Sequence, residues 1–232
     1  MTLKEVMKEL EAKGDPQTKK TWMRHGAKEP IFGVKISEQK LIHRKIKGDQ
    51  ELALQLFDTG NVDAQYLAGI VADGRKMTAA QIQKWVETAN FTYYGITWVA
   101  CENPDGLKLA LQWIDSADEN IATAGWNVLA GLAAMVPDDK LPVKQFGTLL
   151  DRVAKTLKKE KNDVRYAMNS FVIACGTYMA PLADKAMATA QKLGKVEVDM
   201  GDTACKVPDA ESYILKSRKG QPVAPKRKTI RC

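Results

Sequence analysis

The sequence predicts an all-α protein, an α-solenoid of stacked helix pairs. A six-residue line recurs in it as LFDTGN from Leu56, WVETAN from Trp85 and WIDSAD from Trp113, in steps of 29 and 28 residues. Apolar residues at helical spacing precede and follow each line, and strand signals are nearly absent before Lys195. Helix pairs that recur at such a period bury their apolar faces only by stacking on their neighbours.

The elements follow in order along the chain. Residues 1–47 are expected to form N-terminal helices, with a loop that contains glycine and proline at 29–34. The repeats occupy 49–193, with helix pairs at 49–73, 78–102, 104–136 and 142–177 and a closing helix at 180–193. An irregular lobe at 195–211 completes a single domain over residues 1–211. The basic C-terminal tail at 212–232 contains Gly220, Pro222 and Pro225, which favour mobility.

Local signals mark several helix starts. Thr78 with Gln81, and Ser116 with Glu119, have the spacing of a capping box. Asn103 stands before a proline and is a good N-cap for a helix whose first residue is Pro104.

Several functional classes are excluded by what the sequence lacks. It has no apolar run of about 18 residues and no signal-peptide core, so we expect a cytoplasmic protein that does not enter a membrane. With only His25 and His43 and four scattered cysteines, it predicts no metal site and no histidine-based triad. No phosphate-binding glycine motif follows a strand, and no cofactor is expected.

The net charge of +7 is unevenly distributed. Residues 1–47 carry 12 basic and 6 acidic side chains (+6), residues 48–211 carry 16 and 22 (−6), and residues 212–232 carry 7 and none (+7). Within the acidic middle, residues 140–165 hold eight basic side chains and three acids. This stretch predicts a site for a polyanion, and the alternative is an ordinary solvated helix face.

The densest aromatic cluster lies at residues 91–98. Phe91, Tyr94 and Trp98 share one helix face, which is typical of core packing between repeats. Tyr93 points elsewhere, so Tyr93 and Trp126 are the candidates for an aromatic wall that faces a nucleic-acid base. Gly125 and Gly131 around Trp126 favour close helix packing as the alternative.

A family resemblance rests mainly on the C-terminal third. The segments NDVRYAMN from Asn162, KVEVDMGDT from Lys195, CKVP from Cys205 and PKRK from Pro225, together with the helical repeats, resemble the AlkD-like DNA alkylation repair family from about Phe32 onward. The resemblance implies HEAT-like repeats whose concave basic surface cradles duplex DNA. In catalytic members it also implies release of positively charged alkylated purines by cleavage of the N-glycosidic bond.

The resemblance also implies a catalytic set that this chain does not retain. The family has an aromatic residue followed four positions later by Asp, then an Arg on the next repeat and a further Trp. Here these positions fall on Phe91, Gly95, about Ala124 and about Ser170, and no Asp or Glu occurs between Thr88 and Cys101. The nearest acids are expected to act as helix caps: Glu102, Asp115, Asp118 and Glu119.

We therefore expect a monomeric DNA-binding member of this family that contacts the phosphates of duplex DNA. The residues expected to make these contacts are Lys155, Lys158, Lys159, Lys161 and Arg165 in the basic stretch and Lys226, Arg227 and Lys228 in the tail. Excision of cationic alkylated purines stays open, and no catalytic residue is identified. The alternative is a non-catalytic HEAT-like scaffold that binds a protein partner.

Overall fold

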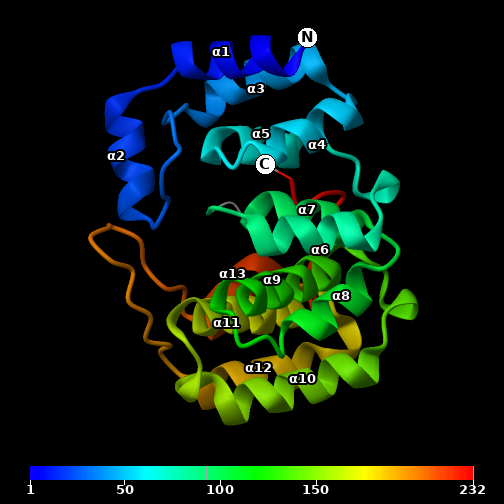
Figure 1. Ribbon diagram of the computed structural model, residues 1–232. Helices are drawn as coiled ribbons and strands as arrows, with labels where there is room; N and C mark the ends of the chain where they lie inside the picture. The colour runs from blue at the N-terminus through cyan, green and yellow to red at the C-terminus, as the bar shows by residue number, and fades with distance from the viewer. Residues whose placement is uncertain (92, 232) are drawn as a thin grey trace. The chain divides into compact units, whose positions relative to one another are not determined.

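The chain folds into α-helices throughout its described part. The computed structural model describes residues 1–91 and 93–231, with the side chains of Tyr93 and Tyr94 left outside the description. This part of the chain contains 13 α-helices, a few short 3₁₀ turns and no β-strand (Figure 1). The all-α prediction is confirmed.

Contacts between residues divide the chain into two compact units. Unit 1 consists of residues 1–106 and 200–204, and unit 2 of residues 107–199 and 205–232. The helices of unit 1 are α1 (Leu3–Ala12), α2 (Pro16–Arg24), α3 (Ile36–Ile46), α4 (Gln50–Asp58), α5 (Val62–Val71), α6 (Ala79–Thr88) and α7 (Tyr93–Glu102). α8 (Gly106–Trp113) begins at the boundary, and unit 2 continues with α9 (Glu119–Met135), α10 (Val143–Thr156), α11 (Asn162–Tyr178), α12 (Ala183–Leu193) and α13 (Ala210–Arg218). The single repeat domain over residues 1–211 stays a prediction.

The predicted helix pairs are present, as α4 with α5, α6 with α7, α8 with α9 and α10 with α11, and α12 follows them. The recurring line marks the end of the first helix in three of the pairs, since α4 ends at Asp58, α6 at Thr88 and α8 at Trp113. Both large apolar residues of each line are buried, and the helix ends within the line. None of the described helices has both the length and the apolar character needed to cross a bilayer.

Two of the three predicted helix starts differ from the structure. The capping box of Thr78 and Gln81 is confirmed. At α9, however, Asp118 replaces Ser116 as the N-cap, and its carboxylate accepts the N–H groups of Asn120 and Ile121 at 2.8 and 3.1 Å. The N-cap of α9 is therefore two residues further along the chain than predicted.

Asn103 is the second difference. It does not start a helix at Pro104, and α8 begins at Gly106. The Asn103 side chain is buried and donates to the carbonyls of Gly74 and Met77 at 2.8 and 2.7 Å. It therefore fastens the turn between α5 and α6 rather than capping α8.

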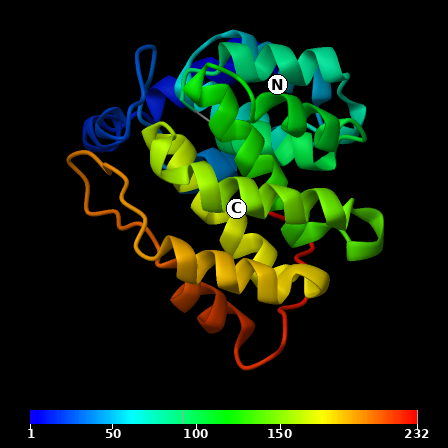
Figure 2. The same cartoon turned by 90° about the horizontal axis from the view of Figure 1, so that it is seen from below.

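The C-terminal tail was expected to be mobile, and the structure corrects this. Residues 210–218 form α13, and the described chain after it returns to unit 2, where the N–H groups of Ala224 and Arg227 donate to the carbonyls of Thr177 and Ala134 at 2.8 Å each (Figure 2). Arg218 donates to the carbonyls of Gly176 and Ala183. The tail satisfies carbonyls at helix ends in unit 2, which no local pattern reveals.

A buried carboxylate organises the N-terminal part of unit 1. Asp63, in the first turn of α5, is 1% exposed. It accepts the consecutive backbone N–H groups of Phe32, Gly33 and Val34 at 2.7, 3.0 and 2.7 Å. Because the N-terminus of a helix favours negative charge, α5 and the loop stabilise the same carboxylate. The 29–34 loop is therefore a fixed element.

We predict that Asp63→Ala destabilises the protein by about 3 kcal/mol or more, because three backbone donors lose a charged acceptor and at least two of them stay buried. Asp118→Ala is the matched control, since it removes a carboxylate that also accepts backbone N–H groups but is exposed, and it should cost about 1 kcal/mol. Urea unfolding of both variants gives the comparison. Equal destabilisation of the two variants would contradict the anchoring role of Asp63.

Candidate nucleic-acid interface

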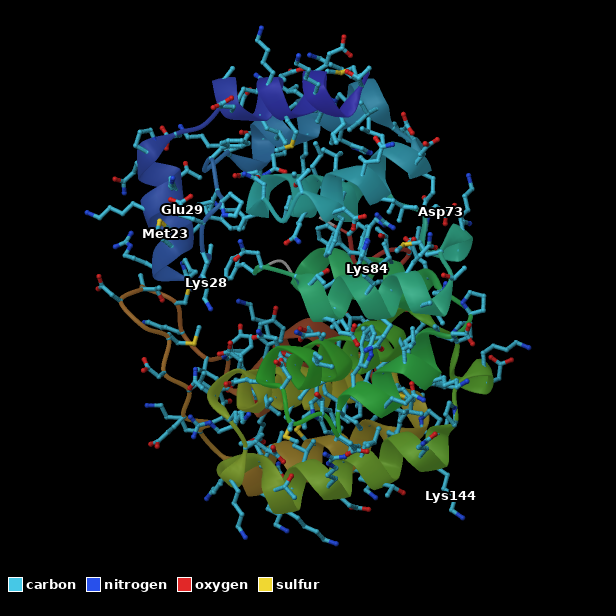
Figure 3. The ribbon with its side chains drawn as sticks, in the orientation of Figure 1. Met23, Lys28, Glu29, Asp73, Lys84 and Lys144 are labelled. Carbon is cyan, nitrogen blue, oxygen red and sulfur yellow. The ribbon has the colours of Figure 1, made fainter. Side chains whose placement is uncertain are left out.

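A group of exposed lysines lies where α10 ends. α10 buries Phe146, Leu150 and Val153 on one face, and Lys155 projects from the other face. The 3₁₀ turn that follows, η3 (Leu157–Lys159), is held by buried Leu157, which leaves Lys158 and Lys159 exposed. We call Lys155, Lys158 and Lys159 the lysine patch. Lys144, also exposed, projects from the start of the same helix (Figure 3).

No carboxylate in the described part of the chain forms an ion pair with a residue of the lysine patch. Two nearby acids are engaged elsewhere: Asp151 pairs with Lys185 at 2.7 Å, and Asp115 pairs with Arg152 at 2.6 Å. Glu160 follows Lys159 in the chain but forms no ion pair with the lysine patch, so the three exposed ammonium groups can attract a polyanion.

Lys161 and Arg165 are more constrained than the lysine patch. The Lys161 ammonium donates to the carbonyl of Ala117 at 2.6 Å, although its side chain is exposed. Arg165 is half-buried and donates to Asn162 Oδ1 at 3.1 Å. Lys161 precedes α11, and Arg165 lies in its first turn. Phosphate contacts by these two residues stay a prediction.

The three predicted tail residues divide into two groups. Lys226 is held within unit 2, where its ammonium pairs with Asp138 at 2.7 Å and donates to the carbonyl of Ala133 at 2.8 Å. Arg227 and Lys228 are exposed. Lys226 therefore has a structural role that the sequence did not indicate, and its neighbours retain the accessibility that a phosphate contact requires.

Trp126 does not occupy the base-facing position that we expected. Its side chain is 0% exposed and makes an edge contact with Phe171, at a centroid separation of 5.2 Å. The guanidinium of Arg152 lies 5.5 Å from the Trp126 ring centroid. The residue is thus core, which was the alternative that the neighbouring glycines favoured. The side chain of Tyr93, the other aromatic candidate, lies outside the described residues.

The position of the family's catalytic carboxylate lies at a helix crossing. Gly95 of α7 is buried and faces Gly69 of α5. A Cβ atom on Gly69 would lie 2.3 Å from the Gly95 Cα, and a Cβ atom on Gly95 would lie 3.0 Å from the Gly69 Cα. The two backbones touch, so this scaffold has no room for an aspartate at residue 95.

Four acids that follow this position in the chain bind backbone or structural partners. Glu102 accepts the N–H of Gly74 at 3.1 Å, and Glu119 accepts the N–H of Asp163 at 2.9 Å. Asp115 pairs with Arg152, and Asp118 caps α9. Asp118 thus caps the helix that follows it, as expected, whereas Asp115 forms an ion pair and Glu102 and Glu119 accept N–H groups from other segments. Ala124, where the family has its arginine, is fully buried.

A second basic surface was not among the predicted site residues. Lys19, Lys20 and Arg24 lie on α2 in unit 1, around a shallow depression. The excess positive charge of residues 1–47 pointed to this region, but the helix-pair pattern begins only at residue 49 and gave no reason to single out α2. Among the described residues, no group of three or more His, Cys, Asp or Glu side chains is arranged to hold a metal ion.

We predict that Gly69→Ala lowers the free energy of unfolding by about 1–3 kcal/mol, because its new methyl group would overlap the backbone of α7. Gly147→Ala is the control, since it also lies in a helix but its Cβ would approach Leu182 Cδ2 and Lys185 Nζ at ordinary distances of 3.5 and 3.7 Å. That variant should be neutral or about 0.5–1 kcal/mol more stable. Thermal or urea unfolding that ranks the two variants in the opposite order would refute the close crossing.

Comparison with known proteins identifies the scaffold. The model of the DNA alkylation repair enzyme family matches residues 6–198. Uncharacterized proteins of Listeria monocytogenes (Lmo0209) and Listeria innocua (Lin0241) are 36% and 35% identical over 226 residues, which cover 94% of this chain and 98% of each relative.

One solved structure is similar over 100% of both chains, with 34% identity and a TM-score of 0.89. It is described as representing a new family of proteins related to the HEAT-like repeat DNA glycosylases with affinity for branched DNA structures. This similarity confirms the HEAT-like solenoid fold predicted from the recurring line. By its sequence over nearly the whole chain, the protein belongs to the DNA alkylation repair enzyme family.

Proposed function

We propose that this protein binds DNA, with preference for branched structures, through phosphate contacts made by the lysine patch. We further propose that it does so without the carboxylate-assisted base excision of catalytic relatives. The observation that carries the proposal is the set of three exposed ammonium groups, Lys155, Lys158 and Lys159, which lack a carboxylate partner in the described chain.

The strength of a phosphate contact depends on whether the lysine already has a carboxylate partner. A phosphate that contacts a free surface lysine displaces only water and counterions, whereas contact with a paired lysine must also compete with a carboxylate. Lys84, for comparison, is paired through both carboxylate oxygens of Asp58, at 2.7 and 2.9 Å. The lysine patch offers the stronger site at equal exposure.

The preference for branched DNA is supported by the similar solved structure, whose protein has affinity for such DNA. A branch brings phosphates of several duplex arms close together and so raises the local density of negative charge. A protein with separate groups of exposed cations gains more from that arrangement than from one straight duplex.

The argument against excision rests on charge stabilisation. Cleavage of the N-glycosidic bond develops positive charge on the sugar, and a carboxylate near that charge stabilises it. The resemblance places that carboxylate at Gly95, which lies at a crossing with no space for a side chain, and the acids of the next two helix ends bind other groups. The protein would thus retain the binding scaffold without this means of catalysis.

We predict that replacing Lys155, Lys158 and Lys159 together by alanine weakens binding to a four-way junction and to a duplex of equal length. The slope of log affinity against log salt concentration should become shallower by about 0.9 for each phosphate that the variant no longer neutralises, or about 2 to 3 in total. Fluorescence anisotropy at several salt concentrations between about 50 and 200 mM measures both quantities.

The control for this experiment is Lys84→Ala, whose ion pair should leave both affinity and salt slope unchanged. An unchanged slope in the triple variant would remove the lysine patch from the interface. If the wild-type protein binds neither DNA at the lowest salt concentration, the phosphate-contact proposal fails and the protein-binding scaffold becomes the favoured alternative.

We also predict that the protein releases no free base from DNA that contains 7-methylguanine. Chromatography of the soluble products should show no more free base than a heat-treated sample, since the cationic base leaves slowly without assistance. Release above that background, proportional to the concentration of native protein, would show that residues outside the family set perform the reaction.

A further inference from the structure

An exposed methionine lies among basic side chains on α2. Pro16, Lys19, Lys20, Met23 and Arg24 line the shallow depression on the outer face of this helix. Met23 is 44% exposed, and the surface around it is largely aliphatic. Figure 3 shows Met23 on this helix, with Lys28 just beyond the helix end. The residues recur at spacings of three and four, so they form one continuous helix face.

The same helix contributes little to the core but is fixed in place. No residue of α2 is fully buried. Trp22 on its other face makes edge contacts with Tyr66 and Phe91, at centroid separations of 5.9 and 5.8 Å. Trp22 therefore attaches the helix to the core of unit 1, and the outer face of the helix stays available.

The N-terminus of α2 is fixed by the backbone of the 29–34 loop. Gly33 has φ +82°, and a Cβ atom there would lie 2.5 Å from the backbone nitrogen of Lys19. Asp15 caps the helix through Thr18, and its own N–H donates to the Gly33 carbonyl at 3.1 Å. Since Asp63 holds Gly33 in turn, the face that carries Met23 is presented in one orientation.

The charge of this face favours an anionic partner. Lys20 is exposed and has no ion pair in the described chain. Lys19 pairs with Glu29 at 2.6 Å, and Arg24 lies 4.0 Å from Asp202. Both acids are more than half exposed, at 60% and 94%, so these surface pairs are weak and a phosphate can replace them.

We propose that Met23 discriminates branched from continuous DNA, by packing its thioether side chain against a base left unstacked at the branch while the neighbouring cations hold the flanking phosphates. The inference rests on the proposed DNA-binding function and adds a determinant of specificity to it. A methionine is long, unbranched and adaptable, and apolar side chains of this kind insert at unstacked base steps. In a continuous duplex the protein would first have to break base stacking, whereas a branch already exposes a base face.

The test compares Met23→Gln with Met23→Leu and Lys20→Ala. Glutamine has nearly the same length and helix propensity as methionine but a polar end, whereas leucine keeps the apolar bulk. We expect Met23→Gln to weaken binding to a four-way junction about tenfold and to leave binding to an equal-length duplex unchanged. Met23→Leu should keep the preference for the junction. Lys20→Ala should weaken binding to both DNAs alike and reduce the salt slope by about 1.

A 2-aminopurine base at the branch point gives an independent measurement. The wild-type protein and Met23→Leu should change its fluorescence, and Met23→Gln should not. If Met23→Gln keeps the wild-type preference and fluorescence change, the role of Met23 is refuted while the DNA-binding function stands. If the wild-type protein binds neither DNA, the proposed function and this inference fail together, which is a distinguishable result.

Discussion

The hydrogen bonds from three consecutive backbone N–H groups to the carboxylate of Asp63 are the constraint on which the N-terminal part of unit 1 depends. A buried carboxylate is costly unless donors surround it, and here the loop at 32–34 supplies them. The loop conformation is thereby fixed without regular secondary structure. Gly33 of this loop then approaches the backbone of Lys19 more closely than a residue with a side chain could. Asp63 therefore positions α2 indirectly, because it holds Gly33 against this helix.

The crossing of α5 and α7 limits what residue 95 can carry, at the position where the family resemblance implies a catalytic carboxylate. Gly69 and Gly95 let two helices approach until their backbones touch, which stabilises the pair through close contacts. A catalytic aspartate at residue 95 would need a wider crossing and a wet or polar site. The chain has the tight crossing, and its nearby acids serve helix ends and ion pairs. The absence of the carboxylate and the close packing of the scaffold are thus one structural feature.

The sequence predicted the repeats well because their ends follow local rules. Apolar spacing and the recurring line located the four helix pairs, although only one of the three predicted N-caps was correct. Errors arose where distant residues decide the outcome. Trp126 is core because Phe171 and Arg152 cover it, and Lys226 is held by Asp138 from a position 88 residues earlier (226 − 138). α13 was missed because its buried residues, Ala210 and Ile214, are too few for a visible pattern.

The charges of the candidate site also depend on contacts that the sequence does not reveal. Residues 48–211 carry a net charge of −6, which taken alone argues against a nucleic-acid partner. The structure shows what many of these acids do: some accept N–H groups at helix N-termini and others pair with nearby cations. The examples are Asp49, Asp118 and Asp209 in the first group and Asp58, Asp115, Asp138 and Asp151 in the second.

Such carboxylates have their charge offset locally by helix dipoles or by cations. The residues of the lysine patch form no ion pair among the described residues. Their effect on a nearby phosphate therefore exceeds what the net charge of the region indicates, since the field at short range depends on which charges are already neutralised. Composition gives the sum of the charges, and only the folded arrangement determines which of them remain available to a partner.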